Sequence, residues 1–191
     1  MSQQSLVLKT DRLELRLPLK EEASNLLEFH QQNQAHFDPW DPPKPEGFFA
    51  EEFWKTYIEK AHTEFESNQS IRLIIIHKET NALIGSINTN SFERGPFQSC
   101  RIGYKMSKSF EGQGYMKEAL RGLIQHLFAE MNFHRIEANH ATHNIRSEAL
   151  LKSLGFHCVG IEPNYLFING RWMDHKLNNL KNENWKNTLE T

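Results

Sequence analysis

The chain has 191 residues, of which 38% are hydrophobic and 24% charged, and its formal net charge is -2 at pH 7. This composition is typical of a soluble globular protein, excludes a disordered or fibrous chain, and gives no electrostatic basis for direct binding to nucleic acid. No apolar run approaches the roughly 20 residues that cross a bilayer, and the N-terminus lacks the pattern of a secretory signal, so we expect a cytoplasmic protein without a membrane partner.

A chain of this length fits one domain, which we expect to span residues 1–191 with a core at about 8–181. Two cysteines, Cys100 and Cys158, are too few for a disulfide framework, and in a reducing cytoplasm we expect both to be buried thiols. A monomer and a homodimer are both compatible with these features.

The first half of the chain combines one strand pattern, two helix patterns and a proline-rich segment. In chain order we expect a strand at 6–17, a helix at 20–34, a stiff loop at 36–47 and a helix at 46–66. The loop is predicted because its four prolines exclude a helix interior. Its aromatic residues Phe37 and Trp40 could form the wall of a pocket.

The second half begins with three strand patterns that predict an antiparallel meander. In chain order we expect strands at 72–77, 82–90 and 99–106, a helix at 116–131, a strand at 134–140, a helix at 144–154, and a hairpin whose strands flank residues 169–170. Asn144 is a suitable N-cap for the later helix and Gly155 a suitable end. Asn169-Gly170 is the strongest hairpin signal in the chain.

Two glycines, Gly112 and Gly114, separate the third meander strand from the 116–131 helix, within SFEGQGYMKEAL. Glycine lets backbone N–H groups approach a ligand closely, and the start of a helix favours an anion such as a phosphate. The alternative is a tight turn with no ligand. Neither the GxGxxG nor the P-loop pattern of nucleotide-binding proteins is present.

The window EGQGYM at 111–116 resembles the Gln/Arg-x-x-Gly-x-Gly/Ala signature of the GNAT superfamily of acyl-CoA-dependent N-acetyltransferases, with the central glycine kept and both ends changed. HRIEANHATHNIRSEALLKSLGF and NYLFINGRWMDHKL are similar to the C-terminal half of the RimJ/RimL group, which acetylates N-terminal residues of ribosomal proteins. The opening LKTDRLELRLP also resembles the first strand of that group.

The resemblance implies an α/β (α+β) fold in which a mixed, strongly twisted sheet has helices on both faces and a splayed central pair of strands. It implies acetyl-CoA as cosubstrate, bound in the gap between those strands, and no metal. The residues that it implies as cofactor contacts are Tyr104, Lys105 and Met106 for the pantetheine arm, Gly112, Gln113, Gly114, Tyr115 and Met116 for the pyrophosphate, and Asn144 and Ser147.

Ser147 matches the position from which related enzymes protonate the departing CoA thiolate, because the tyrosine that other members use is replaced here by Leu151. Ser147 could also be an ordinary serine in a first helical turn, and Asn144 only a cap. The glutamate that often serves as a base in the family is replaced by Asn139. Glu137 and Glu93 are the other candidates for the base, with surface carboxylates as the alternative for both.

The resemblance implies an N-acetyltransferase that acts by direct attack in a ternary complex on a protein N-terminus, by the same resemblance that of a ribosomal protein. Deprotonating an α-amine at neutral pH costs about 1 kcal/mol, whereas a lysine costs about 5 kcal/mol, so a site without a strong base suits the α-amine. Phe37, Trp40 and Tyr165 are candidates to line the acceptor site. The alternatives are a small amine acceptor, such as an amino acid, polyamine or antibiotic, and a catalytically idle acyl-CoA-binding module.

Overall fold

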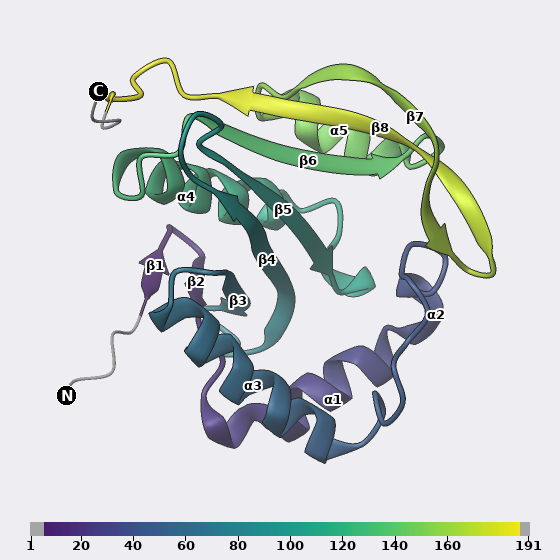
Figure 1. Ribbon diagram of the computed structural model, residues 1–191. Coiled ribbons are helices and arrows are strands. Elements are labelled where there is room, and N and C mark those ends of the chain that lie inside the picture. Colours follow the sequence, from purple (N-terminus) through teal and green to yellow (C-terminus); the bar gives the residue numbers. More distant parts are fainter. Residues whose placement is uncertain (1–5, 188–191) are drawn as a thin grey trace.

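The computed structural model describes residues 6–187, which form one eight-stranded sheet with helices packed against it (Figure 1). The strands are β1 (Val7–Lys9), β2 (Leu13–Arg16), β3 (Ile71–His77), β4 (Leu83–Glu93), β5 (Ser99–Met106), β6 (Arg135–Ala141), β7 (His157–Ile168) and β8 (Arg171–Lys181). The α-helices are α1 (Ala23–Gln32), α2 (Gln34–Phe37), α3 (Glu51–Glu66), α4 (Tyr115–Ala129) and α5 (Ile145–Ser153), with short 3-10 helices η1 (Lys20–Glu22) and η2 (Lys108–Phe110). The strand order is β1-β2-β3-β4-β5-β6-β8-β7, and β5–β6 is a parallel pair in a sheet whose other pairs are antiparallel.

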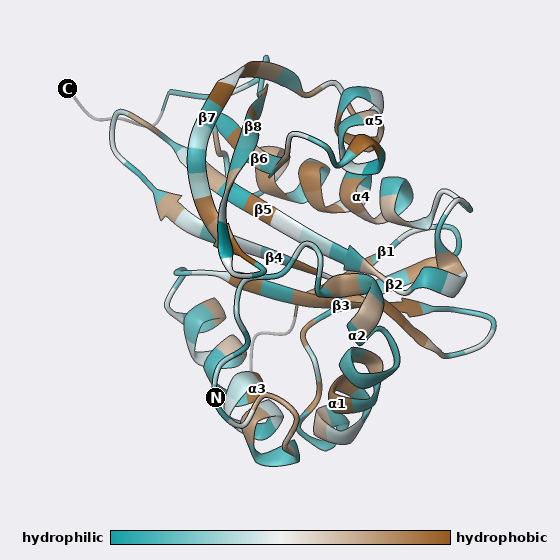
Figure 2. Ribbon diagram, turned by 90° about the vertical axis from the view of Figure 1, so that its right-hand side faces the viewer, coloured by the Kyte–Doolittle hydropathy of each residue, from teal (hydrophilic) through white to brown (hydrophobic). Residues whose placement is uncertain are grey.

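The mixed α/β fold that the sequence predicts is confirmed, with helices on both faces of the sheet (Figure 2). Strand β3 explains why both faces are covered. Ile71, Leu73 and Ile75 join the core that α4 closes, while Ile74 and Ile76 face the smaller cluster under α1 and α3. Such a continuous apolar run is typical of a strand that is buried on both sides.

The antiparallel meander of β3, β4 and β5 and the long amphipathic helix α4 are confirmed. Five α4 side chains are buried at helical spacing, namely Met116, Ala119, Leu120, Leu123 and Leu127. These side chains pack against the apolar side chains of β2, β3, β4 and β5, and together they form the main hydrophobic core. Burial of such a stripe is the main source of helix stability in a protein.

The prediction of one strand at 6–17 is wrong, because this segment forms two short antiparallel strands, β1 and β2. The chain reverses at Thr10, whose backbone N–H donates to the carbonyl oxygen of Leu13 at 3.0 Å. The Thr10 hydroxyl and the Arg12 backbone also donate to the Glu118 carboxylate of α4, at 2.6 and 2.8 Å. These contacts join residues more than 100 positions apart, so the local pattern gave no sign of the turn.

The helix that we expected at 46–66 begins only at Glu51, since Gly47 has a positive φ of 73° and the chain turns twice before α3. The start of the predicted 36–47 loop is also wrong, because His36 and Phe37 belong to the short helix α2. Glu93, expected in a loop, is the last residue of β4.

The later elements follow the predictions closely. Helix α5 begins after Asn144, and the two-residue turn Asn169-Gly170 joins β7 to β8 with positive φ values of 51° and 77°. The β7 strand is longer than expected, and as the edge of the sheet it leaves most of its residues exposed. Cys100 is buried as predicted, but Cys158 is exposed on this edge strand, so that prediction is wrong.

The parallel strands β5 and β6 pair over only three residues, Ser99 to Arg101 with Arg135 to Glu137. Beyond this point they diverge, as Figure 1 shows. The splayed central pair that the resemblance implies is therefore present. Within residues 6–187, we find no helix that combines the length and apolar character needed to cross a membrane.

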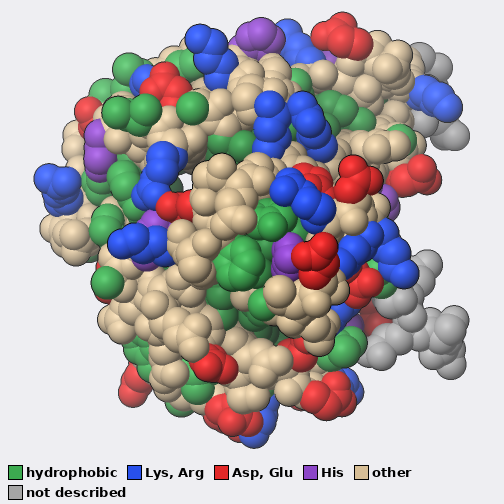
Figure 3. All heavy atoms as spheres, turned by 180° about the vertical axis from the view of Figure 1, so that it is seen from behind, with side chains coloured by type: hydrophobic (Ala, Val, Ile, Leu, Met, Phe, Trp, Pro, Cys, Tyr) green, Lys and Arg blue, Asp and Glu red, His purple; other side chains and the backbone are tan. Residues whose placement is uncertain are grey.

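Basic and acidic side chains are interspersed over the face of the molecule in Figure 3, in keeping with the small net charge.

A buried aromatic cluster between α1 and α3 contains a histidine, His30. The His30 ring stacks on Trp54 at a centroid distance of 4.5 Å and meets the edge of Phe48 at 5.2 Å, and its Nδ1 atom has no hydrogen-bond partner. Burial, helped by the positive charges of Lys105 and Lys44, lowers the His30 pKa to about 3.

This low pKa predicts that acid destabilises the fold through His30. The unfolded chain binds a proton below the ordinary pKa of 6.5 and the folded chain does not, so stability is complete above pH 6.5 and decreases toward pH 3. The loss has a slope of up to about 1.4 kcal/mol per pH unit. Urea unfolding of the wild type and His30→Phe between about pH 7 and pH 5 measures it. We expect a shallower decline for the variant, and parallel declines would contradict the assignment.

Candidate functional site

A cavity of about 730 Å³ opens where β5 and β6 diverge. A volume of this size is typical of a site for a small ligand or cofactor. The sequence-predicted site residues that line it are Phe37, Trp40, Tyr104, Lys105, Met106, Gly112, Gly114, Tyr115, Met116, Asn139, Asn144 and Ser147. Those that do not line it are Gln113, Tyr165, Glu137 and Glu93.

The glycine turn at one end of the cavity has the geometry that an anion site requires. Gly112 and Gly114 have φ values of 73° and 81°, in the left-handed region, and Gly114 is the N-cap of α4. A Cβ atom would meet nothing within 4 Å at Gly112, and at Gly114 only the Arg12 guanidinium, at 3.6 Å. No side chain caps the first α4 amides, so these N–H groups are available to a ligand.

The ion pair between Arg12 and Glu118 holds the glycine turn in place. Arg12 Nε lies 2.7 Å from the Glu118 carboxylate of α4, and its Nη1 donates to the Gln113 carbonyl oxygen at 3.1 Å. Burial raises the pKa of Glu118, but the hydrogen bonds from Thr10 and Arg12 outweigh it and keep the pKa below its ordinary value. The carboxylate is therefore charged at neutral pH and anchors the β1–β2 turn to the start of α4.

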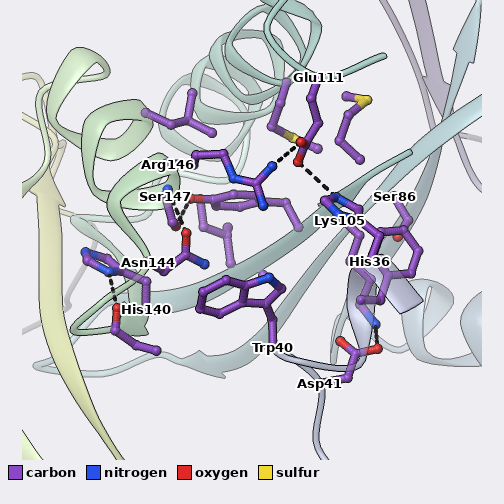
Figure 4. Close-up of a pocket in the computed structure, with 18 of the residues that line it drawn as sticks. His36, Trp40, Asp41, Ser86, Lys105, Glu111, His140, Asn144, Arg146 and Ser147 are labelled. Carbon is purple, nitrogen blue, oxygen red and sulfur yellow. Dashed lines mark hydrogen bonds and ion pairs between the residues drawn. The ribbon is translucent and has the colours of Figure 1, made fainter. Parts of the chain in front are cut away.

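Asn144, Ser147 and Tyr104 form a hydrogen-bonded group that lines the cavity, and Figure 4 shows Asn144 and Ser147 beside each other. The Asn144 side-chain oxygen accepts a 3.1 Å hydrogen bond from the Ser147 backbone N–H, so Asn144 is an N-cap as predicted. The Ser147 hydroxyl lies 2.6 Å from the Tyr104 hydroxyl. Burial raises the Tyr104 pKa to about 12, although the Ser147 hydrogen bond acts to lower it.

The sequence alone did not indicate that the Tyr104 hydroxyl contacts the Ser147 hydroxyl. The tyrosine lies on β5 and Ser147 on α5, 43 positions later, so no local spacing connects them. The position four residues after Ser147 is Leu151, which is 1% exposed and belongs to the core.

The carboxylates that line the cavity are Glu111 and Asp41, and neither was among the candidates for the base. Glu111 lies between two basic side chains: His36 Nε2 is 3.0 Å from one oxygen, and the Arg146 guanidinium contacts the other (Figure 4). Asp41 contacts Lys105 Nζ at 2.6 Å and Lys44 Nζ at 3.3 Å. Ion pairing of side chains from separate elements produces both groups, so sequence spacing could not have found them.

The two glutamates predicted as bases, Glu137 and Glu93, do not line the cavity as Glu111 and Asp41 do. Glu137 faces Arg101 at 3.2 Å near the start of β6, and Glu93 is exposed at the end of β4. Asn139 lies in the cavity wall, and its amide donates to the Tyr165 hydroxyl at 3.0 Å. Tyr165 thus contacts a cavity residue without lining the cavity itself.

Trp40 is half-buried in the cavity wall, against the small cluster of Ala141, Ile168 and Met173. Its ring lies 5.2 Å from that of His143. His140 Nδ1 and the Ala141 carbonyl oxygen are 3.0 Å apart. In the described part of the chain, no group of three or more His, Cys, Asp or Glu side chains is arranged to hold a metal ion.

Comparison with known proteins identifies this arrangement. Residues 12–157 match the model of the acetyltransferase (GNAT) domain. The chain belongs to the GNAT acetyltransferase family. The matched region includes the glycine turn and the Tyr104, Asn144 and Ser147 group, while Leu166, Ile168 and His175 line the cavity from beyond it.

Individual relatives place this GNAT enzyme with the RimJ/RimL-like N-acetyltransferases. It is 32% identical to the [ribosomal protein uS5]-alanine N-acetyltransferase of Escherichia coli. The match extends over 178 residues, which are 93% of this chain and 92% of the relative. The ribosomal-protein-S5-alanine acetyltransferase of Vibrio fischeri has a similar structure, with a TM-score of 0.91 and 28% identity over 95% of this chain and all of that one. Mycobacterium smegmatis RimJ, solved with CoA-disulfide, has a TM-score of 0.85 and 25% identity, covering 94% and 87%.

The Asp41 cluster of this acetyltransferase predicts a measurable stability effect. Asp41→Asn leaves the half-buried Lys105 ammonium without its carboxylate partner, while Lys44 keeps Asp38 at 2.7 Å. We expect a loss of about 2 kcal/mol in the free energy of unfolding, measured by urea denaturation. The matched control is Glu51→Gln, at a half-exposed pair with Lys55, where we expect a change within about 0.5 kcal/mol. Equal effects of the two substitutions would contradict the prediction.

Proposed function

We propose that this enzyme transfers the acetyl group of acetyl-CoA to the N-terminal α-amine of a protein, by direct attack in a ternary complex. The observation that carries the proposal is a single cavity with an uncapped, glycine-bounded helix start at one end, a hydroxyl pair in the middle and an aromatic loop at the other. A long donor and an amine acceptor can meet in such a cavity. The relationship to acetyltransferases of ribosomal protein uS5 favours a ribosomal protein as acceptor.

The donor is proposed to lie along the gap between β5 and β6. Beyond Arg101, β5 does not pair with β6, so its backbone at Tyr104, Lys105 and Met106 is free on that edge for the pantetheine arm. The pyrophosphate is proposed to bind the amides from Gly112 to Met116, where Gln113 contributes its backbone N–H. Asn144 and Ser147 would then contact the pantetheine end near the thioester.

The acceptor amine is proposed to enter past Phe37 and Trp40, and Tyr165 supports this wall through Asn139. Asp41 and Glu111, the cavity carboxylates, are already ion-paired, and Asn139 stands where the family often has a glutamate. A site with this composition suits an amine that loses its proton easily. For an α-amine this costs about 1 kcal/mol at neutral pH, against about 5 kcal/mol for a lysine.

The acceptor is identified by following thiol release from acetyl-CoA with three sets of amines. The first set contains peptides with free N-termini, including one that begins with alanine. The second contains the same peptides with blocked N-termini and one internal lysine, and the third contains small amines. We expect turnover on the first set at a rate at least about tenfold above the others, given the difference in amine pKa. Faster turnover on small amines would refute the protein acceptor, and no turnover on any amine would refute the enzyme itself.

The glycine turn provides the test of the donor site. Gly114→Val places a branched side chain in the space proposed for the pyrophosphate, so we expect CoA binding, measured by calorimetry, to weaken at least about 100-fold. The matched control is Gly170→Val in the β7–β8 turn, which has a similar positive φ of 77°, lies outside the cavity and has nothing within 4 Å of its Cβ position. The control carries the backbone strain without the obstruction, and we expect unchanged CoA affinity. Equal affinity in the two variants would rule out the proposed pyrophosphate site.

A further inference from the structure

The contact between Tyr104 and Ser147 joins strand β5 to helix α5 at the cavity. Tyr104 reaches it from the part of β5 that has left β6, and Ser147 from the first turn of α5. Their hydroxyl oxygens are 2.6 Å apart, a short distance for a hydrogen bond between two hydroxyl groups. Asn144 fixes the serine from the other side by capping its backbone N–H.

The chemistry of the two groups determines which one donates. A phenol is a stronger acid than an alkyl alcohol, so the Tyr104 O–H donates and the Ser147 oxygen accepts. The phenol keeps its proton at neutral pH, because its ordinary pKa of 10 is already well above 7 and burial raises this pKa further, to about 12. The hydrogen of Ser147 must then point away from Tyr104. Both residues line the cavity, so this hydrogen is available to a ligand there.

We propose that Tyr104 is a positioning residue, whose hydroxyl donates to Ser147 Oγ and so directs the Ser147 O–H toward the sulfur of the departing CoA. The inference rests on the proposed function and deepens it. Hydrogen bonds in a chain polarise one another, so the Tyr104 bond also makes the Ser147 O–H a stronger donor.

The acetyl transfer balances as follows. The amine nitrogen attacks the acetyl carbon, the N–C bond forms, and the C–S bond breaks with its electron pair left on sulfur. Ser147 passes its proton to the sulfur and regains one from the acetylated nitrogen through water in the cavity. Tyr104 keeps its own proton throughout and holds the serine oxygen in place at each stage.

This arrangement explains how the site can work with Leu151 four residues after Ser147. The Leu151 side chain is packed into the core and carries no proton. Tyr104 supplies a phenol from a different element, and it acts through the serine. The divergence of β5 from β6 is what allows its side chain to reach α5.

The test compares Tyr104→Phe, Ser147→Ala and the double variant on the best acceptor peptide. We expect Tyr104→Phe to lower kcat by about 10- to 100-fold while the Kd for CoA and the KM for the peptide change by less than about threefold. In the Ser147→Ala background, the same substitution should lower kcat by less than about twofold, because the two side chains act as one unit. Tyr104→Met replaces the tyrosine by a second apolar side chain without a hydroxyl, and it should show the same loss of kcat with little change in Kd and KM.

The matched control is Tyr57→Phe, which removes the hydroxyl of another half-buried tyrosine. Tyr57 donates to Asn88 at 3.2 Å and does not line the cavity itself; Asn88 does, but it has no part in the proposed transfer, so kcat should be unchanged. A Tyr104→Phe enzyme with wild-type kcat, or one whose loss multiplies with that of Ser147→Ala, overturns the inference and leaves the proposed function intact. A loss of CoA affinity with kcat retained also overturns it. Wild-type protein that acetylates no amine overturns both.

Discussion

The early parting of β5 and β6 is the constraint on which the rest of the structure depends. A parallel pair that continued to Met106 would use the β5 backbone for the sheet and close the gap. Because pairing stops after Arg101, the sheet opens at its centre, and the edge of β5, the start of α4 and the start of α5 all face one space. The geometry of the two strands therefore creates the cavity, and the side chains only line it.

An opened sheet loses ladder hydrogen bonds, and the surrounding contacts compensate for this by anchoring each wall separately. Arg12 and Thr10 secure the first turn of α4 through Glu118, and the Asn144 cap secures α5. At the proline-rich loop, Lys105 of β5 contacts Asp41. Each wall thus has its own polar anchor: the anchors of α4 and of the loop join segments that are remote in sequence, and the cap of α5 is local.

The sequence predicted most of the elements, and it predicted the glycine turn at the start of α4, because these depend on local patterns. The α4 stripe, the Asn169-Gly170 turn and the glycine pair are each contained within a short window, and the structure has them where the patterns indicated. The turn at Thr10, the Cys158 exposure and the paired carboxylates Glu111 and Asp41 depend on contacts made only after folding. For the same reason the sequence supplied Tyr104 as a backbone contact but gave no indication that its hydroxyl meets Ser147.

Glu111 gives the cavity a connection between its two ends. The His36 ring comes from α2, the Arg146 guanidinium comes from α5, and the carboxylate that both contact belongs to the loop just before the glycine turn. An anionic ligand that drew Arg146 away would leave Glu111 with the His36 ring as its remaining contact. Under the proposed function, a bound donor would therefore change the electrostatic field at the end of the cavity where the acceptor is proposed to enter.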